Sequence, residues 1–300
     1  MRVSRHIPDI LQAPCALAIG NFDGMHLGHQ ALLRTLLQTA QALDIGSAVM
    51  TFEPHPREFF TPDNAPARLC SLREKLEHFA AVGVEQVYVC AFNGRFAKIA
   101  AEEFIQRILR QSLNAEAILV GEDFRFGAKR AGSTQDFVQA GFNLIKLPQV
   151  DLDNIRVSST RVRTALAKGD LEDAAMLLGR PYSISGKVVH GAKLGRQLGF
   201  PTANVHMRHE RPALTGVYAV KLDGLNSVAN LGVRPTIDGV PKLSLEVHVL
   251  DFNGDLYEKH VHVEFLYKIR DEMKFNGLDA LKAQIAKDVV IARNFFTSRG

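Results

Sequence analysis

The chain has 300 residues, enough for two hydrophobic cores of ordinary size and more than most single domains contain. Hydrophobic residues make up 46% and charged residues 23%, as in soluble globular proteins, and no apolar run approaches the roughly 20 residues of a membrane span. The net charge of +4 is dispersed rather than gathered in a stripe, which argues against nucleic acid and suits small phosphorylated anions. Three cysteines without motif spacing and an N-terminus without an apolar signal region predict a cytoplasmic protein.

The first half of the chain alternates strand and helix patterns. Five apolar runs indicate buried parallel strands: Ala16–Ile19, Ala48–Phe52, Gln86–Phe92, Ala117–Val120 and Asn143–Leu147. Helical patterns lie between or after them: one just after His29, one opened by a capping box at Ser71, and others at Ala97–Leu109, Thr160–Ala167 and Leu171–Leu178. The alternation predicts a doubly wound sheet whose ligand site lies beyond the carboxyl ends of the strands.

The loop after the first of these strands is the most informative stretch, AIGNFDGMHLGHQALL at 18–33. A strand, a glycine-bearing loop and a helix present backbone N–H groups to an anion. His26 and His29 share one face at the start of that helix, where imidazoles can donate hydrogen bonds to phosphate, and Gly28 leaves room for a ligand. Taken alone, the two histidines also fit surface or capping residues, or a pair of zinc ligands.

Three further loops follow strands: TFEPHP (51–56), GEDFRFG (121–127) and RVSSTRVR (156–163). The last has hydroxyls at a helix start followed by arginines, which predicts a second phosphate cradle. Taken singly, residues such as Ser158–Thr160 are more often an ordinary helix cap, and Arg161 and Arg163 fit solvated surface residues.

The pattern changes near residue 181, where Gly179 and Pro181 end the helical period. Strand patterns follow at Tyr182–Val189, Gly216–Leu222, Ser227–Leu231, Leu243–Leu250 and Val261–Ile269, and a helical stripe from Leu278 closes the chain. We therefore predict two domains, 1–181 and 182–300, the second a small antiparallel barrel or sandwich with a C-terminal helix.

Two stretches of the second half carry chemistry. GAKLGRQLGFPTAN (191–204) combines glycines and cations that suit phosphates with Thr202 and Asn204, whose oxygens suit Mg²⁺, although the residues alone also fit a flexible basic loop. Glu246 lies on an alternating strand, and the alternation alone also fits a solvent-facing position.

The first half resembles the nucleotidyltransferase superfamily that carries an HxGH phosphate-binding loop. GNFDGMHLGHQ, TFEPHP, GEDFRFG and VSSTRVR are similar, in that order, to motifs of the adenylyltransferase half of bacterial bifunctional riboflavin kinase/FAD synthetases, with Met25 replacing a small branched residue. The resemblance implies that ATP and its phosphates are held by His26, His29, Gly20, Asn21, Phe22, Asp23, Gly28, Ser159, Thr160 and Arg163. It implies that the flavin and nucleotide pocket is lined by Asp123, Phe126 and Arg156.

The second half resembles the riboflavin kinase part of the same family, through GRQLGFPTAN, ANLGVRPT, LEVHVLDF and IRDEMKF. The resemblance implies an ATP-binding loop formed by Gly191, Lys193, Gly195, Arg196 and Pro201. It further implies that Thr202 and Asn204 hold Mg²⁺–ATP and that Glu246 activates the ribityl hydroxyl. His248 belongs to the motif without an assigned role.

The resemblance therefore implies two successive reactions, phosphorylation of riboflavin to FMN and adenylylation of FMN to FAD, with ATP, riboflavin and FMN as substrates. It implies a Rossmann-like α/β domain followed by the barrel, and neither a nucleic acid nor a membrane as partner. Catalysis is expected from His26, His29, Arg163 and Glu246. Two alternatives stay open at this point: an adenylyltransferase for another phosphorylated cofactor, and a flavin- or RNA-binding regulator built on the same folds.

Overall fold

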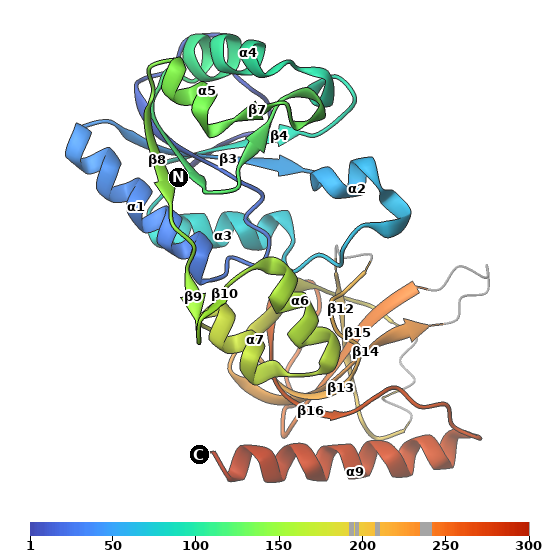
Figure 1. Ribbon diagram of the computed structural model, residues 1–300. Helices are drawn as coiled ribbons and strands as arrows, with labels where there is room; N and C mark the ends of the chain where they lie inside the picture. Colours follow the sequence, from blue (N-terminus) through green and yellow to red (C-terminus); the bar gives the residue numbers. More distant parts are fainter. Residues whose placement is uncertain (192–194, 196–197, 208–210, 235–241, 300) are drawn as a thin grey trace. The chain divides into compact units, whose positions relative to one another are not determined.

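The computed structural model describes residues 1–191, 195, 198–207, 211–234 and 242–299. The chain divides into two compact units (Figure 1). The first comprises Met1–Pro66 and Leu72–Ser158, and the second comprises Ala67–Ser71 and Ser159–Gly300. These compact units do not define the predicted domain boundary, so the boundary at residue 181 stays a prediction.

The first unit is built on a sheet of six parallel strands. In spatial order they are β1 (Arg2–Ser4), β4 (Gln86–Ala91), β3 (Gly46–Glu53), β2 (Cys15–Ile19), β5 (Ala115–Gly121) and β8 (Asn143–Leu147). The five strands that the sequence predicts are all present, and the short β1 adds one edge. Because both faces of a parallel sheet are covered, the central strand β2 is apolar and buried along its whole length.

Alternate residues of the sheet face two separate cores. Ala16 and Ala18 point to the core formed with α1 (Leu27–Leu43) and α3 (Leu72–Val82). Leu17 and Ile19 point to the other core, formed with the π-helical segment η3 (Phe104–Ser112) and α5 (Thr134–Gln139). Figure 1 shows these helices on the two faces of the sheet. The predicted doubly wound sheet is confirmed.

The strand order reverses beside β2, which lies between β3 and β5. In open α/β sheets, a crevice forms at such a point, outside the carboxyl ends of the strands. The short elements of this unit are α2 (Pro56–Phe60), η1 (Pro62–Asn64), η2 (Phe96–Lys98), α4 (Ala101–Glu103), β6 (Arg125–Phe126), η4 (Ala128–Arg130), β7 (Gly132–Ser133), β9 (Asp151–Leu152) and β10 (Ile155–Arg156). The sequence analysis predicted neither α2 nor α5.

The second unit is a closed antiparallel barrel, accompanied by helices. Its strands in spatial order are β11 (Tyr182–Val189), β12 (Ala203–His206), β15 (Lys242–Val249), β14 (Leu225–Arg234), β13 (Gly216–Leu222) and β16 (His260–Arg270). The helices include α6 (Ser159–Lys168), α7 (Leu171–Leu178) and α9 (Leu278–Thr297). The Asp170 side chain caps α7, and Gly179, which was predicted to end the helical period, ends it in the left-handed conformation.

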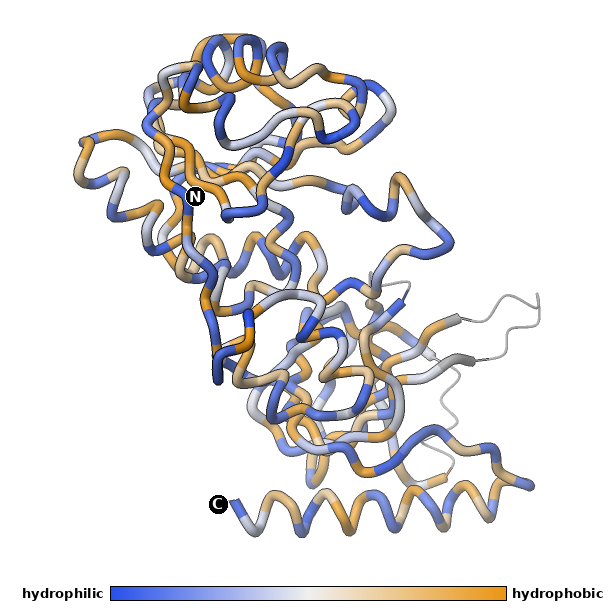
Figure 2. The backbone as a smooth tube through the Cα atoms, viewed as in Figure 1, coloured by the Kyte–Doolittle hydropathy of each residue, from blue (hydrophilic) through white to orange (hydrophobic). Residues whose placement is uncertain are grey.

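Large buried rings fill the barrel, where Tyr218 packs edge-on against Phe265. Helix α9 packs on β13, β14 and β16 through a satellite core that includes Ala292, and Figure 2 shows hydrophobic and hydrophilic segments alternating along it. Leu278, which the predicted stripe included, is 55% exposed, so the buried part of α9 lies further along the helix. The predicted barrel with a C-terminal helix is confirmed.

Among the helices of the described residues, none combines the length and the apolar character that crossing a membrane requires.

Candidate functional site

A cavity of about 680 Å³ opens at the carboxyl ends of the strands in the first unit. Its walls come from the loops after β2, β3, β4, β5 and β8, as expected beside a point of reversed strand order. The predicted site residues that line it are Gly20, Asn21, Phe22, His26, Gly28, His29, Asp123, Phe126 and Arg156. Asp23, which was also predicted, is buried and does not line this cavity.

The histidine pair is fixed by the start of α1. His26 is the N-cap residue, and its Nδ1 accepts a hydrogen bond from the backbone N–H of His29 at 3.4 Å. The two imidazole rings stack with centroids 3.7 Å apart. A Cβ at Gly28 would lie 3.2 Å from the His26 ring, so a larger residue at this position would press against that ring.

Polar atoms at this end of the cavity lack partners. Nδ1 of His29 and Oδ1 of Asn21 are buried without a hydrogen bond in the described part of the chain. Burial lowers the pKa of His29 well below 6.5, and the nearby His26 and Lys75 lower it further. His29 is therefore a neutral imidazole at pH 7 in this structure, and an incoming ligand would satisfy an otherwise costly buried polar group.

The loop between β2 and α1 is held in an unusual conformation. Phe22 and Met25 both have left-handed backbone angles, with φ of 51° and 49°. The buried ring of Phe22 packs edge-on against Phe79 of α3 and also contacts His29, each with centroids 5.2 Å apart. This packing holds the loop in place beside the histidines.

The opposite part of the cavity is aromatic, which the sequence analysis missed. Phe52, Phe92 and Phe96 form a cluster with ring centroids 5.6–5.9 Å apart. Phe52 is near the end of β3, and Phe92 directly follows β4. Of the phenylalanines on this side, only Phe126, from a recognised motif, was predicted. Phe52 and Phe92 each stand at the carboxyl end of a predicted strand, and that position was a signal that they could line the site.

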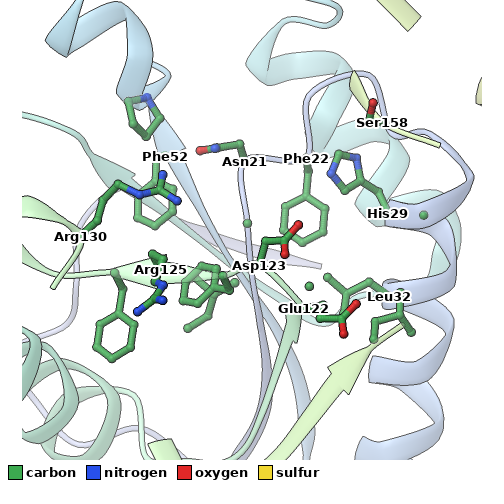
Figure 3. Close-up of a pocket in the computed structure, with 18 of the residues that line it drawn as sticks. Asn21, Phe22, His29, Leu32, Phe52, Glu122, Asp123, Arg125, Arg130 and Ser158 are labelled. Atoms are coloured by element: carbon green, nitrogen blue, oxygen red, sulfur yellow. The ribbon is translucent and has the colours of Figure 1, made fainter. Parts of the chain in front are cut away.

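Charged side chains lie around the same cavity. Asp123 and Arg156, both predicted, form an ion pair across its wall, and both are substantially exposed. Arg125 and Arg130 add positive charge, and Figure 3 shows them on the opposite side of the view from His29. The cavity thus combines hydrogen-bonding groups at the start of α1, an aromatic wall and cationic side chains.

The predicted residues Ser159, Thr160 and Arg163 lie on α6, in the second compact unit. Nε of Arg163 donates a hydrogen bond to the carbonyl of Ala67 at 2.6 Å. Their predicted contact with the phosphates stays a prediction.

In the barrel, strand register brings two predicted residues together. Glu246 on β15 is directly opposite Asn204 on β12, and its other neighbour is Asn230 on β14. Glu246 is half-buried. The sequence analysis treated 191–204 as one loop, but Ala203 and Asn204 begin strand β12, which fixes Asn204 beside Glu246.

The segment before β12 packs closely on the same residues. A Cβ at Gly191 would lie 2.4 Å from the side-chain amide of Asn204, and one at Gly195 would lie 3.1 Å from Oγ1 of Thr202. Both glycines therefore allow a close approach that a larger residue would prevent. Lys193 and Arg196, also predicted here, lie outside the described residues.

Thr202 and Asn204 supply neutral oxygen donors, which fit Mg²⁺ that arrives with ATP phosphates better than a metal held by protein alone. The described residues contain no group of three or more His, Cys, Asp and Glu side chains that could hold a metal ion.

Comparison with known proteins relates both halves of the chain to one family. The profile of FAD synthetase matches residues 9–161, and the profile of riboflavin kinase matches residues 178–296. A bifunctional riboflavin kinase/FMN adenylyltransferase of Pseudomonas fluorescens is 49% identical over 93% of this chain and 92% of its own length. The chain belongs to the bifunctional riboflavin kinase/FMN adenylyltransferase family.

Further relatives agree with this family. The protein of that name from Escherichia coli K12 is 46% identical over 99% of this chain and 98% of its own length. A crystal structure titled as a macrolide-efflux protein from Streptococcus pneumoniae is 32% identical and superposes with a TM-score of 0.79 over 97% of this chain and 98% of that one. That likeness supports the fold. The name refers to the Streptococcus pneumoniae protein and is not carried over to this chain.

Membership of the bifunctional riboflavin kinase/FMN adenylyltransferase family assigns one activity to each half of the chain. The FAD synthetase match covers the sheet with its histidine pair and aromatic cavity. The riboflavin kinase match covers the barrel with Glu246 and Asn204. The resemblance noted from the motifs is confirmed, and ATP, riboflavin and FMN are the substrates of the two reactions and FAD the final product.

Proposed function

We propose that the cavity in the first unit binds ATP and FMN for adenylyl transfer. The backbone N–H groups at the start of α1, together with His26 and His29, hold the ATP phosphates. The unpartnered Nδ1 of His29 and Oδ1 of Asn21 support this assignment, because a ligand would satisfy both.

In the same cavity, the aromatic wall accommodates the flavin ring. Phe52, Phe92 and Phe96 provide flat apolar surfaces, which suit the planar isoalloxazine system. Phe126 extends this wall, and the cations beside it balance the charge of FMN. The volume of about 680 Å³ lies within the range of small-molecule sites.

In the adenylylation step, a phosphate oxygen of FMN attacks the α-phosphorus of ATP, and the bond to the β-phosphate breaks to release pyrophosphate. The nucleophile is already an anion and needs no general base, so catalysis rests on alignment and on charge stabilisation. Because the pKa of His29 is lowered, its imidazole contributes hydrogen bonding first. It gains a positive charge only when the triphosphate raises that pKa.

In the barrel, Glu246 is the general base for riboflavin. It takes the proton of the ribityl 5′-hydroxyl as that oxygen attacks the γ-phosphorus, and ADP leaves. A positioned carboxylate contributes roughly 10²–10⁴-fold to such a step. Thr202 and Asn204 hold Mg²⁺ with the ATP phosphates, and the metal supplies charge neutralisation there. The observation that carries this proposal is the register that sets Glu246 opposite Asn204.

Two single substitutions test the assignment. Glu246→Gln should abolish phosphorylation of riboflavin and leave adenylylation of supplied FMN intact. His29→Ala should leave the kinase step intact and slow adenylylation by about 10²–10³-fold, the loss typical of one oxyanion donor. Loss of both activities in either variant, with the fold retained by circular dichroism, would contradict the assignment of separate sites. We further propose that the domain boundary lies at residue 181 and that the protein is cytoplasmic.

A further inference from the structure

His248 connects the strand of the proposed base to the segment of the proposed metal ligands. It follows Glu246 by two residues on β15, so both side chains leave the same face of that strand. Its Nδ1 lies 2.8 Å from the carbonyl oxygen of Pro201, and its ring packs edge-on against Phe200 with centroids 5.6 Å apart. Pro201 directly precedes Thr202.

The hydrogen bond from His248 to Pro201 lies just beyond the end of the β12–β15 pairing. The β12–β15 pairing runs from Val205 opposite Leu245 to Ala203 opposite Val247. Thr202, the next residue, precedes β12. Pro201 has no N–H, so its carbonyl is its only backbone group able to form a hydrogen bond. The His248 side chain therefore attaches this segment to β15 beyond the end of the ladder.

The chemistry of the contact settles which atom carries the proton. A carbonyl oxygen only accepts, so Nδ1 of His248 donates, in either the neutral or the charged form of the ring. The attachment consequently survives a change in the charge of His248.

We propose that His248 is a positioning residue of the kinase site. By holding the Pro201 carbonyl, it positions Thr202, which lies outside the ladder, relative to Glu246 and Asn204, which the ladder already sets side by side. All three residues must meet the same ATP γ-phosphate. This inference rests on the roles proposed above for those three residues.

A pair of variants with nearly the same shape tests the proposal. His248→Asn can place an amide N–H near the position of Nδ1, whereas His248→Leu has a similar shape without a donor. Without ligand, backbone amides in peptides covering 198–207 should exchange with deuterium about 3- to 10-fold faster in the Leu variant than in wild type, and at near wild-type rates in the Asn variant. Peptides from the first unit should be unchanged.

Steady-state kinetics supply the second measurement. The Leu variant should raise KM for Mg²⁺–ATP in riboflavin phosphorylation by about 10-fold with a smaller change in kcat, and the Asn variant should restore most of it. Adenylylation of supplied FMN should be unchanged in both.

Equal behaviour of the Asn and Leu variants would overturn the proposal, because the donor would then not matter. A fall in kcat with unchanged exchange would also overturn it, since His248 would then act on the chemistry directly. Failure of the proposed function itself is detected separately: an active Glu246→Gln variant would refute the base assignment whatever the His248 variants show.

Discussion

A buried ion pair attaches the last barrel strand to α9, and breaking it should destabilise the second unit strongly. Arg270 ends β16, and its Nε and Nη2 donate to both carboxylate oxygens of Asp288 at 2.8–3.1 Å. Gln284 donates a further hydrogen bond to Oδ1 at 2.9 Å. The Asp288 side chain is 2% exposed and that of Arg270 is 17% exposed, so water screens the pair poorly.

The substitution Asp288→Ala leaves a largely buried guanidinium without its counterion. Removing one partner of a buried pair lowers the free energy of unfolding by about 3–5 kcal/mol. At about 3 °C per kcal/mol for a unit of this size, the melting temperature of the second unit should fall by roughly 10–15 °C. In the double variant Arg270→Met/Asp288→Leu, apolar side chains replace both charges, so most of this loss should be recovered.

The assay follows calorimetric unfolding together with thermal inactivation of each reaction, because the two units need not unfold together. Riboflavin phosphorylation should be lost at a lower temperature, and adenylylation of supplied FMN should be less affected. The matched control is Asp251→Ala, which breaks a bidentate pair with Arg293 on the same helix, where both side chains are exposed. Equal losses for Asp288→Ala and Asp251→Ala, or a double variant no better than the single one, would refute the reasoning.

Three further outcomes are expected. The pKa of His29 is lowered in the folded state, so below pH 6.5 the unfolded chain binds more protons than the folded chain. As the pH decreases below 6.5, the free energy of unfolding should therefore decrease by at most about 1.4 kcal/mol per pH unit. Urea unfolding of His29→Gln should show a weaker dependence on pH. An identical slope in both proteins would contradict this. Burial raises the pKa of Cys15 and of Cys90 to about 12, so both thiols should resist alkylation by iodoacetamide at pH 8 until urea unfolds the chain. Rapid alkylation of either thiol in the native protein would contradict this expectation. A Cβ at Gly186 on β11 would lie 2.4 Å from the His206 carbonyl oxygen on β12. Gly186→Ala should therefore lower the melting temperature of the barrel by several degrees in calorimetry. An unchanged melting temperature would show that β11 and β12 can move apart at no cost.

The part of the site that the sequence predicted is local in the chain. His26 and His29 were identified because an N-cap residue and the residue three positions later necessarily meet at the start of a helix. The aromatic wall was missed for the opposite reason. Phe52 and Phe92 come from different strands, and their contact requires β3 and β4 to be neighbours. Hydrophobic periodicity identifies a strand but carries no information about which strand lies next to it.

The second unit gives the same contrast. Alternation alone predicted five strand patterns, including that of Glu246, but it left the face of Glu246 open. Pairing with β12 and β14 places Glu246 between Asn204 and Asn230, on the strand face opposite the fully buried Leu245 and Val247. Strand β12 was itself missed, because four residues directly after a glycine-rich stretch give too short a pattern to recognise.

The amino-acid sequence by itself therefore determined the class of each half, the starts of α3 and α7 and the motifs, since these depend on residues within a few positions of one another. Only the tertiary structure decided which loops share the cavity and which residues face Glu246. Those contacts depend on strand order and register, which are set by burial of whole faces and by closure of the barrel.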